Sequence, residues 1–247
     1  MELDFLLPTT GQEHRERKME KSKVISIQSQ VVYGHVGNSA AVFPMQMRGI
    51  SVFPVPTALF SNHPHYPTMY GNTLNADWLE GLLKGVEDRG LITSETIILS
   101  GYLGSSENAL VISEFIQRVR KYNPGIIYIC DPVMGDDDFG TYVQDGIVNI
   151  LRDSLVPLAT IITPNQYELG LLTDKKNRTV DGLKEAGLKL REYGTRHLVT
   201  TGCVFDDTKA GCIETTLYQE TELHRTAKPK LPLRPCGTGD LFTSFLL

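Results

Sequence analysis

The sequence predicts an α/β fold in which helices cover both faces of a mostly parallel β-sheet. Short apolar runs rich in β-branched residues alternate along the chain with longer segments of helical periodicity. A connection long enough to hold a helix joins parallel strands, whereas antiparallel strands need only a tight turn. The 247 residues, of which 41% are hydrophobic, supply enough chain for a sizeable core.

The expected elements follow one another in a regular order. Strands, each a short β-branched run, are expected at residues 24–28, 50–55, 96–100, 126–130, 160–163 and 197–201. Helices, each with an apolar face, are expected between them at residues 38–48, 76–89, 106–122, 145–155 and 180–193. Asn75 is the expected N-cap of the second helix, and Gly49 and Gly90 end the first two. Beyond Gly202 the alternation stops, and residues 211–218 and 221–226 are expected as antiparallel edge strands.

Composition divides the chain into two parts. Residues 1–23 are rich in charge and poor in apolar periodicity, which predicts a flexible polar N-terminal tail. Residues 24–247 contain no repeat and no low-complexity segment, so we expect them to form a single domain.

Charge and cysteine usage exclude several classes of protein. The net charge is −5, with 24 Lys and Arg against 29 Asp and Glu, so the basic stripe that a nucleic-acid partner requires is missing. The apolar runs fall far short of the ~20 residues that cross a bilayer. The four cysteines have no CxxC spacing and are too few for a disulfide scaffold. We therefore expect a soluble cytoplasmic protein that binds neither nucleic acid nor membrane.

Polar residues gather directly after the expected strands. Singly, each has the ordinary interpretation of a turn or cap residue. Together they predict a site, because ligands of parallel α/β sheets bind beyond the carboxyl ends of the strands. In chain order these residues are Ser29, Ser61, Asn62, His63, Gly101, Tyr102, Asp131, Asp136, Thr163, Asn165, Glu168 and Thr201.

The most informative segment is GTGD at residues 237–240, at the start of an expected helix. Gly237 and Gly239 flank Thr238 and let successive backbone N–H groups point out of the helix N-terminus, where an anion such as phosphate binds. Asp240 can be read as a residue that complements the helix dipole. A carboxylate beside an anion site makes better sense as a base that accepts a proton from an attacking hydroxyl.

Several other motifs are missing or unpersuasive. The sequence has no GxxxxGK[ST] P-loop, no GxGxxG after the first strand, and no protein-kinase HRD or DFG motif. His63 and His65 could suggest metal ligation, but Pro64 separates them and the sequence offers no Cys or Glu partner nearby, so we expect no zinc site. Cys236 is interpreted as a small packing residue, although the adjacent helix start could lower its pKa.

Taken together, these segments resemble the pyridoxal kinase family, within the ribokinase-like superfamily. The resemblance rests on SIQSQVVYG at 26–34, VGNSA at 36–40, SNHPHY at 61–66, SGYLG at 100–104, CDPVMGD at 130–136, TPN at 163–165 with Glu168, and GTGD. It runs in the same order from about residue 24 to the end of the chain. SNHPHY and the complete GTGD are similar to the pyridoxine/pyridoxal/pyridoxamine kinase branch. The resemblance implies a three-layer α/β/α ribokinase-like fold.

The resemblance also implies an activity and roles for individual residues. The activity is ATP-dependent phosphorylation of the 5′-hydroxymethyl group of pyridoxal, pyridoxine and pyridoxamine, the salvage route to pyridoxal 5′-phosphate. The implied vitamer-binding residues are Ser29, Val36, Phe60, His63 and Tyr102. Asp131, Asp136, Thr163 and Glu168 would handle Mg²⁺ and a monovalent cation, K⁺ or Na⁺. Asn165 and Thr201 would contact the ATP phosphates, Gly237, Thr238 and Gly239 would form the anion hole, and Asp240 would be the base.

Two alternatives stay open at this point, and the resemblance adds two expectations about the whole chain. A hydroxymethylpyrimidine kinase of the same superfamily would share the anion hole and the metal carboxylates. A catalytically impaired pyridoxal-binding protein would keep the ring pocket alone. The family forms homodimers, and its members continue beyond the helix of Asp240, so this chain is expected to lack C-terminal helices.

Overall fold

The computed structural model describes residues 22–247, with one large sheet running through them. The strand order is β11-β10-β9-β8-β5-β4-β1-β2-β3. The parallel strands are β1 (Lys23–Tyr33), β2 (Ser51–Asn62), β4 (Thr96–Ser100), β5 (Ile127–Cys130), β8 (Ile161–Ile162) and β9 (His197–Cys203). Antiparallel strands complete both edges, namely β3 (Gly71–Thr73), β10 (Cys212–Gln219) and β11 (Glu222–Pro229). The predicted mostly parallel sheet with antiparallel edges is confirmed.

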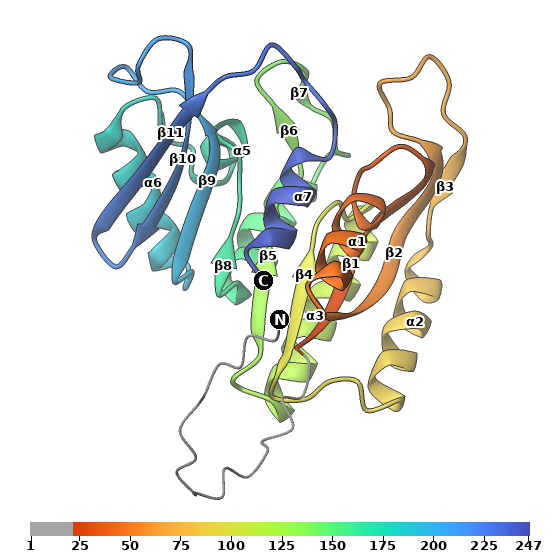
Figure 1. The fold of residues 1–247 in the computed structure, drawn as a ribbon. Helices are drawn as coiled ribbons and strands as arrows, with labels where there is room; N and C mark the ends of the chain where they lie inside the picture. The colour runs from red at the N-terminus through yellow and green to blue at the C-terminus, as the bar shows by residue number, and fades with distance from the viewer. Residues whose placement is uncertain (1–21) are drawn as a thin grey trace, which may run out of the picture.

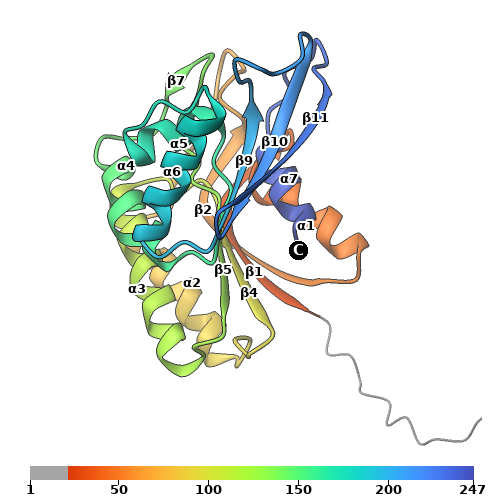
Figure 2. The ribbon, with the colours of Figure 1, turned by 90° about the vertical axis from the view of Figure 1, so that its left-hand side faces the viewer.

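Helices cover the two faces of the sheet and give three layers (Figures 1 and 2). One face carries α2 (Ala76–Asp88), α3 (Ser106–Tyr122), α4 (Ile147–Ile150), α5 (Gln166–Thr173) and α6 (Val180–Glu192). The opposite face carries α1 (Asn38–Met47) and α7 (Thr238–Phe245). The α-helices described in residues 22–247 all fall short of the length and apolar character that a membrane crossing requires.

The core lies on both sides of the sheet because alternate strand residues face opposite layers. Ile98 and Tyr128 join the cluster that packs against α2, α3 and α6, whereas their neighbours Leu99 and Ile129 join the cluster beneath α1. Burial of such strands on both faces explains why the sequence shows continuous apolar runs instead of alternation.

Several predicted boundaries were wrong. Residues 145–155 form only the short α4, followed by a π-helical turn at Leu151–Leu155 and a 3₁₀ turn at Val156–Leu158 that contains Pro157, which cannot donate a backbone hydrogen bond. β1 continues past Gln28 through a bulge, and β2 continues past Pro54 and Pro56. A strand tolerates proline where one edge is unpaired, and β3 pairs with β2 only from Ala58 to Phe60.

Three elements were not expected at all: β3, α5 and the hairpin of β6 (Gly135–Asp136) and β7 (Gly140–Thr141). The other boundaries shift by only a few residues, and α3 spans the predicted range. The predicted N-terminal tail at 1–23 falls almost wholly on residues 1–21, which lie outside the described residues.

Candidate functional site

The site lies at the carboxyl edge of the parallel strands. Ser29, Tyr102, Asp131, Thr163 and Thr201 lie in or directly after β1, β4, β5, β8 and β9. These strands are parallel neighbours in the sheet, so their carboxyl ends meet at one edge. The start of α7 lies near the same edge, although α7 comes from the C-terminal end of the chain, as Figure 1 shows.

The glycine-rich segment before α7 is held against the loop between β1 and α1. Gly237 is the N-cap of α7 and has a φ of 77°, in the left-handed region that favours glycine. A Cβ at this position would lie 1.9 Å from the carbonyl oxygen of His35. Only glycine therefore permits the approach, which leaves the exposed Thr238 and Gly239 at the helix start with backbone N–H groups available to an anion.

Asp240 is joined to Ser29 through Gly37. The backbone N–H of Gly37 lies near the Asp240 carboxylate and favours its ionised form, which lowers its pKa. Gly37 itself packs against Ser29, since a Cβ on Gly37 would lie 2.2 Å from the Ser29 carbonyl oxygen and 2.6 Å from its hydroxyl. Burial raises the pKa of Asp240 above the ordinary aspartate value, while the Gly37 N–H opposes that rise. The expected base and an expected ring-binding residue thus belong to one local structure.

Asp131 lies at the centre of a group of carboxylates that includes Glu168 and Asp240. It is 4% exposed, and burial raises its pKa well above the usual range, with the negative charges of Glu168 and Asp240 adding to the rise. Its carboxylate Oδ2 lies 3.3 Å from the hydroxyl of Thr243, which in turn lies 3.1 Å from the hydroxyl of Thr163. A cation would offset this repulsion, and its oxygen ligands are already present.

Glu168 and Asn165 form a capping box at the start of α5. The Asn165 side chain accepts the Glu168 backbone N–H at 2.9 Å, and the Glu168 carboxylate accepts the Asn165 N–H at 2.8 Å. Glu168 also accepts the backbone N–H of Met134 at 2.9 Å. Burial still dominates and raises its pKa to about 7, although these backbone bonds oppose the rise. Asn165 also pairs with Thr201 through a parallel β-bridge, which brings the two expected phosphate contacts together.

The acidic hairpin β6–β7 is fastened to both sides of the site. Asp136 closes the turn, because its Oδ1 accepts the backbone N–H groups of Asp138 and Phe139, each at 2.8 Å. Asp137 forms an ion pair with Arg178, and Asp138 lies 2.5 Å from Arg234 in the segment before α7. The segment forms a paired hairpin, in which Gly135 pairs with Thr141 and Asp136 with Gly140.

Tyr142 follows this hairpin and was missed by sequence reasoning. Partial burial raises its pKa above the ordinary tyrosine value, and the charges of Glu168, Asp136, Asp131 and Asp240 add to the rise. Its hydroxyl is therefore held neutral beside the carboxylates. No motif marks Tyr142, because its place depends on the fold of the hairpin.

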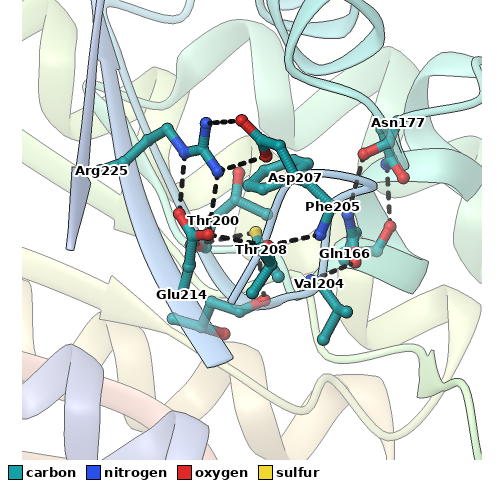
Figure 3. A network of polar contacts seen from close by, with 11 residues as sticks. Gln166, Asn177, Thr200, Val204, Phe205, Asp207, Thr208, Glu214 and Arg225 are labelled. Carbon is teal, nitrogen blue, oxygen red and sulfur yellow. Dashed lines mark hydrogen bonds and ion pairs between the residues drawn. The ribbon is translucent and has the colours of Figure 1, made fainter. Parts of the chain in front are cut away.

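A polar network, shown in Figure 3, supports the part of the edge beside Asn165 and Thr201. Gln166, next to Asn165, donates to the Asn177 carbonyl at 2.8 Å and accepts the Val204 N–H at 3.0 Å. Arg225 on β11 binds both Asp207, at 2.8 Å, and the buried Glu214, also at 2.8 Å. The network fixes the loop that follows Cys203, the last residue of β9, two residues beyond Thr201.

The expected ring-binding residues come from several elements, and two of them, Val36 and His63, lie at the loop between β1 and α1. Tyr102 is half-buried, burial raises its pKa, and its carbonyl accepts the Thr57 hydroxyl at 2.6 Å. Val36 belongs to that loop and lies beside Gly237, and His63 lies beside Gly34 of the same loop. Phe60 lies on β2 opposite Val31.

One sequence interpretation was wrong at this site. Cys236 lies beside the two histidines that were judged to have no cysteine partner, with its Sγ 3.0 Å from Nδ1 of His65. Burial and the charges of Asp136 and Asp240 raise the pKa of Cys236, so they outweigh any lowering by the adjacent helix start. The signal is absent from the sequence, because 171 positions separate His65 from Cys236.

The fold has three layers, and the carboxyl edge of its sheet carries buried carboxylates and a glycine-rich helix start. These features define a protein of the ribokinase-like class. Residues 94–247 match a family described as phosphomethylpyrimidine kinase. The pyridoxine/pyridoxal/pyridoxamine kinase of Bordetella avium is 42% identical over 90% of this chain and 75% of its own length. This chain therefore belongs to the pyridoxal kinase family.

Further relatives extend the comparison. The pyridoxal kinase of Arabidopsis thaliana is 37% identical over 92% of this chain and 74% of its own length. The solved pyridoxal kinase of Leishmania donovani, in complex with ADP and pyridoxamine, is 27% identical, with a TM-score of 0.83 over 91% of this chain and 80% of that one. A putative phosphomethylpyrimidine kinase from Bacteroides thetaiotaomicron, solved with pyridoxal, has 28% identity and a TM-score of 0.81, and covers 91% of this chain and 78% of its own.

Proposed function

We propose that this protein transfers the γ-phosphoryl group of ATP to the 5′-hydroxymethyl group of pyridoxal, pyridoxine and pyridoxamine. The observation that carries the proposal is the local structure in which Gly37 joins Asp240 to Ser29 beside the start of α7. A base, a ring-binding group and an anion site within one short span suit transfer to a hydroxymethyl group on a small ring. The family membership and the vitamer in the Leishmania complex agree with this substrate.

The vitamer would bind against the loop between β1 and α1. Tyr102 would stack on the pyridine ring, Ser29 would bond its polar substituents, and Val36, Phe60 and His63 would complete the pocket. The hydroxymethyl group would then point toward Asp240. The Asp240 carboxylate accepts the hydroxyl proton as the oxygen attacks the γ-phosphorus, and the bond to the β-phosphate oxygen breaks to release ADP.

ATP would lie on the other side of the anion hole. Asn165 and Thr201 would contact its phosphates, and the N–H groups at Gly237, Thr238 and Gly239 would hold charge on the migrating phosphoryl group. Asp131, Asp136, Thr163 and Glu168 would hold Mg²⁺ and a monovalent cation, K⁺ or Na⁺, directly or through water. The donor set fits, because all four side chains offer oxygen and the charges acting on Asp131 are negative. Bound Mg²⁺ would neutralise charge on the phosphate oxygens.

A second candidate is phosphorylation of hydroxymethylpyrimidine. It is favoured by the match of residues 94–247 to the phosphomethylpyrimidine kinase family. Both substrates carry a hydroxymethyl group on a nitrogen heterocycle, so the anion hole and base serve either one. The ring pocket decides between them, and SNHPHY at 61–66 favours the vitamer.

ADP release with each substrate tests the proposal. We expect turnover with pyridoxal, pyridoxine or pyridoxamine in the presence of ATP and Mg²⁺. Turnover with hydroxymethylpyrimidine alone would establish the second candidate. Pyridoxal binding without any ADP release would identify a binding protein in place of an enzyme. We also propose that the enzyme is cytoplasmic and forms a homodimer. Light scattering of the purified chain would check the homodimer.

A further inference from the structure

Three side chains that can bind a metal meet at the outer rim of the site. The proposed reaction places His63 in the vitamer pocket and gives His65 and Cys236 no role. His63 and His65 follow β2, and Cys236 precedes α7. One potential ligand atom from each lies within 4.8 Å of the others. The Cys236 Sγ lies 3.0 Å from Nδ1 of His65, and the two imidazole rings are 5.6 Å apart and nearly perpendicular.

An aromatic ring lies beside each of the two imidazoles. The ring of Phe139, from the acidic hairpin, lies 4.5 Å from the ring of His65. The ring of Tyr66 lies 4.5 Å from the ring of His63, and a Cβ at Gly34 would lie 3.0 Å from Cδ2 of His63. Neighbouring rings narrow the orientations open to the imidazoles, so less conformational entropy is lost when a metal binds.

The chemistry of this donor set is specific. Thiolate and imidazole are the ligands of zinc and of cobalt as its substitute, whereas Mg²⁺ selects oxygen. A site with three protein ligands leaves a fourth, open position for water or another ligand. The nearby carboxylates of Asp136 and Asp240 add negative charge around the thiol, which favours a cation there.

We propose that His63, His65 and Cys236 form a binding site for a divalent transition metal of the zinc type, separate from the Mg²⁺ carboxylates. The metal would replace the proton between Cys236 and His65. It would also displace the 3.3 Å hydrogen bond from the His65 backbone N–H to Nδ1 of His63, or use the other nitrogen of that ring. The broken bond is long and lies at the surface, where water replaces it.

A bound metal would clamp the segment at 63–66 to the segment before α7. Because His63 is one of the residues proposed to line the vitamer pocket, the clamp would hinder vitamer entry, and this consequence rests on the proposed function. Zinc would then inhibit by raising the KM for pyridoxal at constant ATP. The metal site itself does not depend on that function and is tested without substrate.

Cobalt titration of the purified full chain tests the site directly. Cobalt bound to a thiolate gives a charge-transfer absorption in the near ultraviolet, and tetrahedral cobalt gives intense visible bands. We expect both, at one metal per chain, with no nucleotide present. Cys236→Ser is expected to abolish the thiolate absorption and weaken binding at least tenfold, and His65→Gln to weaken binding at least tenfold.

Matched substitutions provide the controls. Cys212→Ser removes another partly exposed thiol, and His224→Gln removes a surface imidazole on β11; both are expected to keep the cobalt spectrum. Folding of every variant is checked by circular dichroism. A thiolate absorption that survives in folded Cys236→Ser would overturn the proposal. Wild-type protein that binds no cobalt in this way would also overturn it and leave a thiol–imidazole hydrogen bond only. Either result leaves the ADP-release assay unaffected.

Discussion

Asp240 is partly buried beside the carboxylate of Asp131, whereas ordinary helix-start aspartates are exposed. Burial raises its pKa, and its charge also acts on Asp131. Such a setting disfavours the folded protein and is characteristic of functional sites. Since a base must be ionised to accept a proton, the rate should fall as pH falls through this raised pKa. The acid limb of the kcat profile should therefore lie above the range of an exposed aspartate.

Substitution of Asp240 separates catalysis from helix stability. Asp240→Asn keeps the size and removes the base, so kcat should fall ~10²-fold or more, with little change in the Kd for ATP or pyridoxal. Asp77→Asn is the matched control, because Asp77 is an exposed carboxylate in the first turn of α2. It should leave kcat unchanged. If Asp240→Asn lowers the melting temperature alone, Asp240 is only a dipole-complementing residue.

Tyr102 is expected to act through its aromatic face. Stacking on a pyridine ring contributes on the order of 1 kcal/mol beyond area burial. Tyr102→Ala should therefore raise the KM for pyridoxal several-fold and leave ATP binding unchanged, while Tyr102→Phe should retain the wild-type value. Steady-state kinetics of both variants and of Ser29→Ala decide the point. A vitamer KM that stays constant in Tyr102→Ala and in Ser29→Ala would remove this pocket from the account.

At the scale of elements, the start of α7 depends on Gly237. Gly211 offers a matched control, because its φ is 76° against 77° at Gly237 while a Cβ there meets nothing within 4 Å. Gly211→Ala should cost ~1 kcal/mol from backbone strain alone. Gly237→Ala adds a clash with the His35 carbonyl, so it should cost more and weaken ATP binding as well. Urea unfolding and ATP titration measure both effects; equal costs with intact ATP binding would contradict this reading of α7.

Elements with strong local signals could be predicted from the sequence. The apolar face and caps of α2 and α3 fix these helices almost to the residue. The helix α5 was missed although Asn165 and Glu168 carry the spacing of a capping box, a signal that could have found it. The π-helical turn after α4 and the extension of β2 through two prolines depend on tertiary pairing, which no local pattern records.

At the scale of the whole molecule, the site also divides into a part that the sequence could predict and a part that depends on tertiary structure. Residues that directly follow strands could be placed at one sheet edge, because parallel topology alone brings strand ends together. Contacts between segments that are distant in the sequence could not be predicted in this way. The approach of Cys236 to His65 and of Asp138 to Arg234 depends on how the hairpin and the segment before α7 cross the edge.

The buried carboxylates should link stability to pH and to Mg²⁺. The pKa of Glu168 is about 7 in the folded protein against 4.5 ordinarily, so between these values the folded state binds more protons. The free energy of unfolding therefore falls as pH rises through that window. Mg²⁺ binds the ionised form, so it should raise the melting temperature more at about pH 8 than at about pH 5.5.

Glu168→Gln should make the rise in melting temperature caused by Mg²⁺ more similar at the two pH values. Glu222→Gln, at an exposed position on β11, should leave the difference between them unchanged. Thermal melts with and without Mg²⁺ at both pH values make the comparison. A Mg²⁺ effect that does not vary with pH in the wild-type chain would contradict a cation role for Glu168.

The central claim is transfer of phosphate to the 5′ oxygen, and the product's phosphorus spectrum tests it most directly. Pyridoxal, ATP and Mg²⁺ are incubated with the wild-type chain, and with Asp240→Asn as the comparison. The account predicts one new phosphate ester whose phosphorus couples to the 5′-methylene protons, formed at least ~10²-fold more slowly by the variant. Release of inorganic phosphate alone, or an ester at another oxygen, would contradict it.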